Sequence, residues 1–343
     1  MSTSPAPLYP LKLAPIYKEK VWGGRALAAR GRDLPGDGDT PVGESWELAD
    51  LAVTSTGGGG GSERSAVANG PLAGRTLHEL VATHGSALLG DLPLTAAGGF
   101  PVLLKYLDAN ANLSVQVHPS PAWAAAHADA HLKSEAWYIV DAAPGAVIYK
   151  GLIDGVTPDA LRAALRQNTD AAVVPLLRAV PVQPGDCHYL VSGTCHALGA
   201  GVLVAEVQTP SDTTYRVYDW GRTGRELHVE PALACIDFDP PTGEGELNAK
   251  VDDRLTRLVE CEHFRIDRVT AEANTVDAHT HNQPAAWMIL EGRLTLDGGG
   301  QSVNAGPCDT VLLPPNVSTH VTAHDHATWL EVTFPQAEQT KLA

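Results

Sequence analysis

The sequence predicts a mostly-β protein with two jelly-roll β-barrel domains, the first of which carries helical insertions. Short apolar runs recur between turn-forming residues, and 25 prolines and 33 glycines in 343 residues favour many short strands. The regular alternation of strand and helix that marks a parallel sheet is missing. Hydrophobic residues make up 44% and charged residues 19%, as in an ordinary globular chain.

The pattern changes after residue 221, and a connector rich in Pro and Gly follows at 239–243. We therefore expect one domain over 1–238 and a second over 239–343. In the second domain, FRIDRV alternates apolar and polar residues, and LTLDGGGQSV reads as two strands around an Asp-Gly turn.

Helix-start signals predict three helical insertions in the first domain. They open with a Thr-x-x-Glu capping box, a Ser-Pro pair and a Thr-Pro pair. The expected helices span about 76–89, 121–132 and 157–168. Gly57–Gly61, five glycines in succession, predict a flexible surface loop.

Charge and composition exclude several classes of partner. The formal net charge of −16 disfavours nucleic acid, because affinity for nucleic acid comes from neutralising phosphates with Lys and Arg. No apolar run reaches the ~20 residues of a membrane span, and no signal peptide is recognisable, so we expect a cytoplasmic protein without a membrane partner. The five scattered cysteines contain no C-x-x-C pair, which disfavours disulfides and cysteine zinc sites.

The heptad NLSVQVH (112–118) is the most informative segment. Strand alternation places Ser114, Gln116 and His118 on one face. The other face carries Leu113, Val115 and Val117. Inside a small barrel the three polar groups would need a bound metal or substrate as partner. The alternative is a half-buried strand whose polar face meets solvent.

Two further segments can complete a metal site. Glu135 lies in LKSEAWYIV, and His196 follows a Pro-Gly-Asp turn, a short strand and a turn of small residues, a layout typical of a cupin metal site. With Gln116 and His118 they supply two imidazoles, one carboxylate and one amide oxygen, which suits Zn²⁺. A single anionic ligand would leave the metal able to polarise a substrate oxygen.

The remaining histidines are expected not to bind metal. His127 and His131 are spaced i, i+4, but no carboxylate accompanies them, so a solvated helix face is favoured. His279, His281 and His320 resemble a degenerate cupin site. Alanines (Ala285 and Ala286) stand where its carboxylate ligand would be expected, so we expect a structural repeat without metal.

Several longer strings resemble the type I mannose-6-phosphate isomerases, most closely their short bacterial branch. They are PIYKEKVWGG (15–24), GESWELAD (43–50), PVLLKYLDANANLSVQVHP (101–119), KSEAWYIV (133–140) and SGTCHALGAGVLVAEVQTPSDTTYRVYDWGR (192–222). The resemblance implies a catalytic cupin domain over 1–238, a degenerate cupin-like domain over 239–343, and cytoplasmic carbohydrate metabolism. It also implies one zinc ion per chain on the residues matching Gln116, His118, Glu135 and His196.

The resemblance also implies roles in the interconversion of mannose 6-phosphate and fructose 6-phosphate through an enediol or enediolate. Arg216 matches an essential arginine, and Lys133 matches a lysine two positions before the zinc glutamate. Lys105 and Ser114 match substrate- or phosphate-binding positions. Chemistry favours Arg216 for stabilising an oxyanion and Lys133 for moving the proton, with Glu206 as another base or substrate contact.

A phosphorylated sugar needs local positive charge in this acidic chain. Lys105, Lys133, Arg216, Arg222 and Arg225 lie in or beside the matched strings and can supply it. Two other function classes stay open from the sequence. One is a non-catalytic protein that binds sugar phosphates, and the other is a metal-dependent cupin enzyme acting on a different sugar phosphate.

Overall fold

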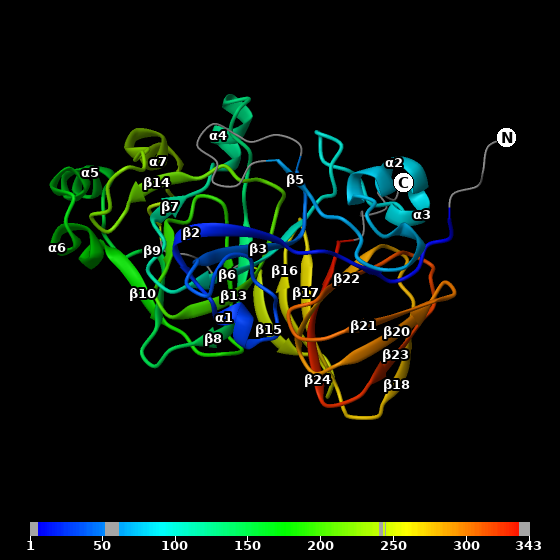
Figure 1. The fold of residues 1–343 in the computed structure, drawn as a ribbon. Helices are drawn as coiled ribbons and strands as arrows, with labels where there is room; N and C mark the ends of the chain where they lie inside the picture. Colours follow the sequence, from blue (N-terminus) through cyan, green and yellow to red (C-terminus); the bar gives the residue numbers. More distant parts are fainter. Residues whose placement is uncertain (1–5, 52–61, 240–242, 244, 336–343) are drawn as a thin grey trace. The chain divides into compact units, whose positions relative to one another are not determined.

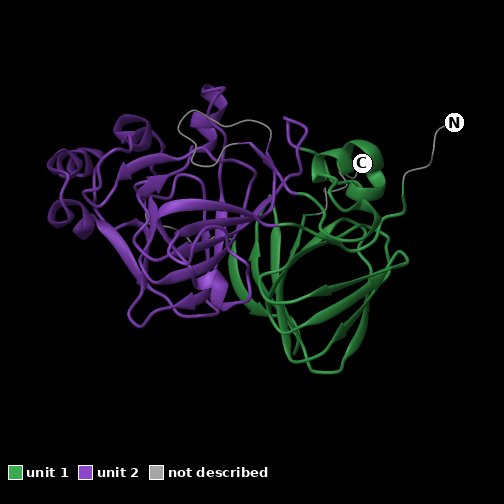
Figure 2. Cartoon of the chain, viewed as in Figure 1, with its two compact units in different colours: residues 1–14, 66–94, 245–343 green, residues 15–65, 95–244 purple. Residues whose placement is uncertain are grey.

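The computed structural model describes residues 6–51, 62–239, 243 and 245–335, and strands predominate over helices (Figure 1). The mostly-β prediction is confirmed. The chain divides into two compact units (Figure 2). Unit 1 comprises residues 1–14, 66–94 and 245–343, and unit 2 comprises residues 15–65 and 95–244. The glycine run at 57–61 lies outside the described residues.

This grouping differs from the contiguous division expected at 238/239. Residues 1–14 group with the C-terminal segment because β1 (Leu11–Lys12) pairs antiparallel with β22 (Thr310–Leu313), and residues 66–94 join them through a β-bridge between Leu13 and Val67. The backbone N–H of Leu13 then donates to the carbonyl of Thr310 (3.0 Å). Pairing between the two ends of the chain leaves no local signal in the sequence, so the discontinuous unit could not be anticipated.

Unit 2 contains two larger sheets that share a core. Buried residues of both sheets, among them Trp137 and Leu107 from one and Ile148 and Leu198 from the other, form one cluster. The six-stranded sheet has the order β11 (Cys187–Leu190), β8 (Glu135–Ala142), β13 (Val202–Gln208), β6 (Leu103–Ala109), β3 (Val42–Leu48) and β2 (Ile16–Gly24). The five-stranded sheet has the order β10 (Leu177–Pro181), β9 (Val147–Leu152), β12 (His196–Leu198), β7 (Val115–Val117) and β14 (Tyr215–Tyr218). A small sheet joins β4 (Asp50–Leu51) and β5 (Glu63–Arg64).

Three helices of unit 2 pack against the outer face of the five-stranded sheet. The Thr157 hydroxyl accepts from the N–H of Ala160 and caps α5 (Pro158–Gln167), which agrees with the helix expected at 157–168. Its buried Leu161 and Leu165 share a cluster with Val115 and Val117 of β7. The other helices of unit 2 are α1 (Ala26–Ala29), α4 (Pro121–Ala126), α6 (Asp170–Val173), η2 (Val174–Leu176) and α7 (Val229–Cys235).

The helix expected at 121–132 is shorter than predicted, because α4 ends at Ala126. The ring of His127 stacks on Trp123 at 3.8 Å, and its Nδ1 bonds the Trp123 carbonyl at 3.0 Å. That carbonyl would otherwise accept the next helical N–H. His127 and His131 therefore do not share a helix face, and neither belongs to a described group of metal-ligand atoms.

Unit 1 also contains two larger sheets around one core, to which Trp287 and Trp329 contribute from one sheet and Leu296 and Val321 from the other. The seven-stranded sheet has the order β1, β22, β19 (Ala285–Glu291), β24 (Ala327–Thr333), β17 (Arg265–Ala271), β16 (Leu255–Glu260) and β15 (Glu246–Lys250). The four-stranded sheet has the order β18 (Val276–His279), β23 (Thr319–Ala323), β20 (Leu294–Gly298) and β21 (Gln301–Ala305). The hairpin of β20 and β21 confirms the two strands predicted there.

The helix expected at 76–89 belongs to unit 1 and is broken in two. The predicted capping box is confirmed, since Thr76 and Glu79 bond each other's backbone N–H. Gly85 then adopts a φ of +50°, which separates α2 (Leu77–His84) from α3 (Ser86–Leu89). A short helix, η1 (Gly70–Leu72), precedes them.

All described sheets are open, so the jelly-roll barrels stay a prediction. The five cysteines are free. Within the described ranges, none of the helices combines the length and apolarity needed to cross a membrane. The cytoplasmic location stays a prediction.

Candidate active site

Strand β7 brings polar side chains into the space between the two sheets of unit 2. Val115 and Val117 pack under the helices, so Gln116 points the opposite way, as the alternation predicts. His118 and Ser114 are only 2% and 4% exposed, which excludes a solvent-facing polar strand. Leu113 was wrongly assigned to the face of Val115 and Val117. It precedes the regular strand and packs in the inter-sheet core instead.

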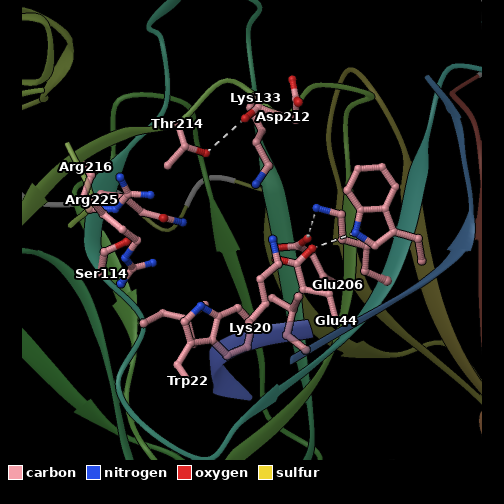
Figure 3. Close-up of a pocket in the computed structure, with 15 residues that line it drawn as sticks. Lys20, Trp22, Glu44, Ser114, Lys133, Glu206, Asp212, Thr214, Arg216 and Arg225 are labelled. Carbon is pink, nitrogen blue, oxygen red and sulfur yellow. Dashed lines mark hydrogen bonds and ion pairs between the residues drawn. The ribbon is translucent and has the colours of Figure 1, made fainter. Parts of the chain in front are cut away.

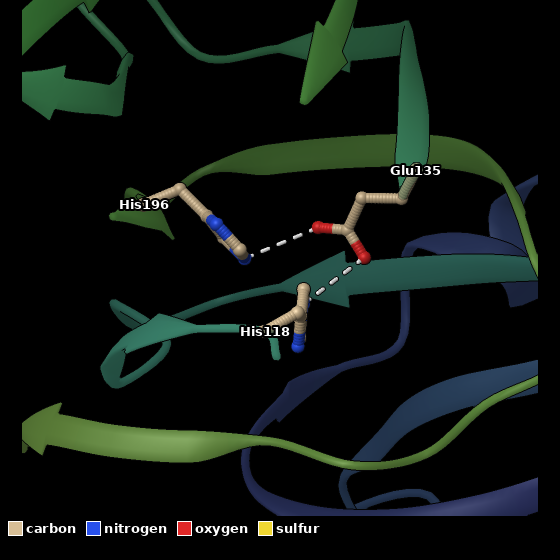
Figure 4. Close-up of side chains that lie close together, drawn as sticks. All are labelled: His118, Glu135 and His196. Carbon is tan, nitrogen blue, oxygen red and sulfur yellow. Dashed lines mark ion pairs between the residues drawn. The ribbon is translucent and has the colours of Figure 1, made fainter. Parts of the chain in front are cut away.

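His118, Glu135 and His196 meet in this space (Figure 4). Their ligand atoms lie within 4.8 Å of one another, and all three side chains are buried. The Nε2 atom of His118 lies 3.4 Å from Oε2 of Glu135, and Nε2 of His196 lies 3.2 Å from Oε1. His196 and Glu135 begin strands of different sheets, so packing of the sheets assembles the group.

Backbone carbonyls fix both imidazoles. Nδ1 of His118 lies 2.9 Å from the Thr213 carbonyl, and Nδ1 of His196 lies 2.8 Å from the Thr194 carbonyl. A carbonyl only accepts, so each Nδ1 carries the hydrogen. Burial and Lys133 lower the pKa of His118 to about 3, so its ring is neutral and its Nε2 offers a lone pair.

This lone pair faces a carboxylate oxygen of Glu135, which is also an acceptor. Nε2 of His118 and Oε1 of Glu135 are shielded from solvent and have no hydrogen-bond partner. Acceptors that face one another need a cation between them, because buried unpartnered polar groups are costly. Histidines whose second nitrogen bonds a backbone carbonyl are the usual form of metal-binding imidazole. The residues present therefore fit a divalent metal ion.

Gln116 is positioned to be a fourth ligand. It pairs with His196 across β7 and β12, and its Nε2 lies 3.3 Å from Nε2 of His196. Rotating the amide by 180° exchanges its oxygen and nitrogen with little change in shape. The amide oxygen would then face the same point as the two imidazoles and the carboxylate.

Lys133 lies directly beside the Glu135 carboxylate, 2.6 Å from Nζ to Oε2. Burial disfavours its ammonium form, but Glu135 and Glu206 outweigh burial and raise the pKa of Lys133. To act as a base, Lys133 would need a lowered pKa, and the residues around it do not lower its pKa. Lys133 can donate a proton as the site stands, and it becomes a base only when Glu135 is neutralised by another cation.

A pocket opens next to the metal-ligand group (Figure 3). Gln116 and Lys133 line the pocket and also contact His196 and Glu135 of the group, so an occupant of the pocket would lie close to the metal-ligand group. Five cationic side chains and three carboxylates line the pocket, which supplies the local positive charge that the acidic chain otherwise lacks. The charged lining residues are Lys20, Lys105, Lys133, Arg216, Arg225, Glu44, Glu206 and Asp212.

Lys105 and Glu206 form a buried ion pair on neighbouring strands of the six-stranded sheet. Nζ of Lys105 lies 3.4 Å from Oε2 of Glu206 and 4.7 Å from the centre of the Trp46 ring. The indole Nε1 of Trp137 donates to the other carboxylate oxygen at 3.1 Å. Burial raises the pKa of Glu206, although Lys133 and Lys105 act against that shift.

Arg216 enters the pocket from β14, where it pairs with Gln116 of β7. Its Nη1 donates to the Glu226 carbonyl at 2.9 Å, while its buried Nε has no partner. Burial and Arg225 lower the pKa of Arg216, which still remains charged. Of the other two arginines expected near the pocket, Arg225 lines it and Arg222 does not.

Comparison with known proteins agrees with this geometry. Residues 10–145 match the family model described as "Phosphomannose isomerase type I, catalytic domain". The mannose-6-phosphate isomerase ManA of Bacillus subtilis is 38% identical over 267 residues, which is 76% of this chain and 78% of that protein. The chain belongs to the type I phosphomannose isomerases. The mannose-6-phosphate isomerase of Streptococcus mutans is 37% identical over 238 residues, 68% of this chain and 69% of that protein.

The fold of this type I phosphomannose isomerase is also similar to solved structures. The crystal structure of the mannose 6-phosphate isomerase from Bacillus subtilis aligns with a TM-score of 0.81 at 29% sequence identity. The alignment covers 95% of this chain and all of the other. The recognised family is thus supported over both units.

Sequence reasoning missed several pocket residues of this phosphomannose isomerase. Lys20 and Glu44, which form an ion pair at 3.1 Å, and Asp212 and Thr214 all line the pocket. Each lies in or beside a string that resembles the family, which was the available signal. Trp22 and Trp46 are buried and also line the pocket.

Proposed function

We propose that this protein is a zinc-dependent mannose-6-phosphate isomerase that interconverts mannose 6-phosphate and fructose 6-phosphate. The observation that carries the proposal is the buried group of His118, Glu135 and His196 beside a cationic pocket, in which Nε2 of His118 and Oε1 of Glu135 have no hydrogen-bond partner. The relatives named mannose-6-phosphate isomerases support the substrate.

One zinc ion would be held in unit 2 by Gln116, His118, Glu135 and His196. Two imidazole nitrogens with carboxylate and amide oxygens form a set that suits Zn²⁺. When bound, the ion supplies a Lewis acid that polarises an oxygen of the sugar. Its charge would also neutralise Glu135 and weaken the carboxylate's hold on the Lys133 proton.

The chain's own residues would then move the proton between C1 and C2 through an enediol or enediolate. Arg216 is permanently charged, so it can stabilise the developing oxyanion and orient the sugar oxygens. Lys133 is a candidate proton carrier, because its Nζ lies 2.6 Å from Oε2 of Glu135. Glu206, held by Trp137 and Lys105, is the alternative carrier or a contact to the sugar.

The substrate's phosphate would occupy the cationic part of the pocket. Lys105 and Ser114 line it and would contact the substrate, and Arg225 adds a charge that sequence reasoning had placed near the site. The acidic chain as a whole repels anions, so these local charges must provide the attraction.

A coupled assay of mannose 6-phosphate turnover, run before and after chelation and again after Zn²⁺ addition, tests the proposal. Turnover should disappear with the metal and return with zinc. His118→Ala should lose both zinc and turnover, whereas Arg216→Ala should keep zinc and lose turnover by roughly 10²–10³-fold. Arg222→Ala is the matched control, because Arg222 lies outside the pocket and its partner Asp219 stays paired with Arg225.

No turnover by the folded, zinc-loaded protein would contradict the proposal. It would favour a protein that only binds sugar phosphates, or an enzyme acting on a different sugar phosphate. Full activity in either His118→Ala or Arg216→Ala would contradict the assignment of the site residues.

A further inference from the structure

Unit 1 contains a second group of metal-ligand side chains that the proposed isomerase reaction does not use. His279 ends β18, His281 follows it in the chain, and Glu331 lies on β24. One ligand atom from each residue lies within 4.8 Å of the other two. The histidines were recognised in the sequence, but the carboxylate was not.

The third member of the group differs from the sequence expectation. His320 was grouped with His279 and His281, yet its side chain on β23 is exposed. The alanine at 285, where a carboxylate was expected, is fully buried and offers no ligand. Glu331 supplies the missing carboxylate from the adjacent strand, since β19 and β24 pair antiparallel with Trp287 opposite Glu331.

The core of unit 1 holds the carboxylate in place. Residues directly opposite on paired strands share a face of the sheet, so Glu331 points to the same side as Trp287, which belongs to the core. The indole Nε1 of Trp287 donates to Oε2 of Glu331 at 2.7 Å. The ring of His279 lies edge-on to the Trp287 ring at 5.0 Å, which orients the imidazole toward the same place.

Both imidazoles carry a nitrogen without a partner. Nε2 of His279 and Nε2 of His281 are shielded from solvent and make no hydrogen bond, and Nε2 of His281 lies 3.7 Å from Oε2 of Glu331. A shielded imidazole nitrogen without a partner is costly. A cation bound between these nitrogens and the carboxylate would satisfy all three residues together.

We propose that His279, His281 and Glu331 form a second metal site, which binds a divalent transition metal ion such as Zn²⁺ or Co²⁺. Two imidazoles and one carboxylate are borderline ligands that suit these ions better than Mg²⁺ or Ca²⁺. Three protein ligands leave coordination positions for water or a small ligand. The site lies wholly within unit 1, so it does not depend on the proposed function of unit 2.

Metal stoichiometry of the full-length protein tests the proposal. Protein stripped with chelator is titrated with Co²⁺, following heat release and the visible absorption of the bound ion, and bound metal is counted after dialysis. We expect about two bound ions per wild-type chain and one per Glu331→Gln chain. The affinity of the second site for Co²⁺ should be at least about tenfold lower in Glu331→Gln than in the wild type. The amide oxygen of the substituted side chain can still accept the hydrogen bond from Trp287, which preserves the fold.

Two further variants separate this site from the site in unit 2. His118→Ala should lose one ion and keep the ion that Glu331→Gln loses. His320→Asn is the matched control, because it changes an exposed histidine of the same unit, and it should bind both ions. A wild-type chain that binds one ion, or a Glu331→Gln chain that binds as many as the wild type, would overturn the second site and leave the proposed function untouched.

Discussion

Replacing Lys105 with Met would test whether the buried charges of the pocket stabilise one another. The Lys105 side chain is only 8% exposed, and its ammonium lies 3.4 Å from Oε2 of Glu206, whose side chain is 3% exposed. Lys105 also helps to hold the pKa of Glu44 below its ordinary value, against the effect of burial. Met keeps an unbranched side chain in the same place, so the change mainly removes the charge.

Removing one partner from a buried ion pair costs about 3–5 kcal/mol, because the other charge stays buried. Lys133 also faces Glu206, so we expect the lower end, about 3 kcal/mol. Unit 2 spans about 200 residues, a size at which 1 kcal/mol shifts Tm by about 2–4 °C. Lys105→Met should therefore lower the Tm of unit 2 by roughly 6–12 °C.

The double variant Lys105→Met/Glu206→Gln removes both charges and should recover most of that loss. The amide oxygen at position 206 can still accept from the indole of Trp137. We expect the double variant to unfold within about 1 kcal/mol of the wild type, as is common when a buried pair is replaced by neutral groups. Calorimetry on chelator-treated protein at neutral pH would measure both variants without a contribution from bound metal.

Two results would refute this reasoning. A Lys105→Met protein with a Tm within about 2 °C of the wild type would mean that the charges are effectively solvated. A double variant that loses as much stability as the two single variants together would mean that Lys105 and Glu206 act independently.

Three other predictions follow from the same unit. Lys105 and Lys20 hold the pKa of Glu44 below 4.5 in the folded protein despite burial. As the pH falls, the Glu44 carboxylate is therefore protonated in the unfolded chain before it is protonated in the folded protein, so the free energy of unfolding falls as the pH drops below about 4.5. Glu44→Gln should make Tm less dependent on pH as the pH falls below about 4.5. Gly23→Ala would place a Cβ 2.4 Å from the backbone nitrogen of Gly43, and calorimetry should show a loss of about 1–3 kcal/mol. Zinc at 100 times its Kd should raise the Tm of stripped protein by an amount equivalent to about 2.7 kcal/mol, and His118→Ala should lack that rise.

Local sequence signals predicted much of the secondary structure. The capping box at Thr76 and the Thr-Pro start at 157 specify helix starts through bonds to residues only three positions away, and both are observed. Helix ends were less predictable. The end of α4 at Ala126 depends on the stack of His127 on Trp123, which the sequence pattern does not reveal.

The sequence by itself determined the residue types of the unit 2 site and, through strand alternation, the direction of Gln116 on β7. Tertiary structure decided what surrounds them. Glu135, two positions along the chain, contributes most to the raised pKa of Lys133, and Glu206, which lies 73 positions away and is brought close by sheet pairing, adds to it. The position of Glu331 beside His281 likewise depends on the register of β19 and β24. Alternation along a strand is a local property of the backbone, whereas register and sheet packing join residues that no local pattern connects.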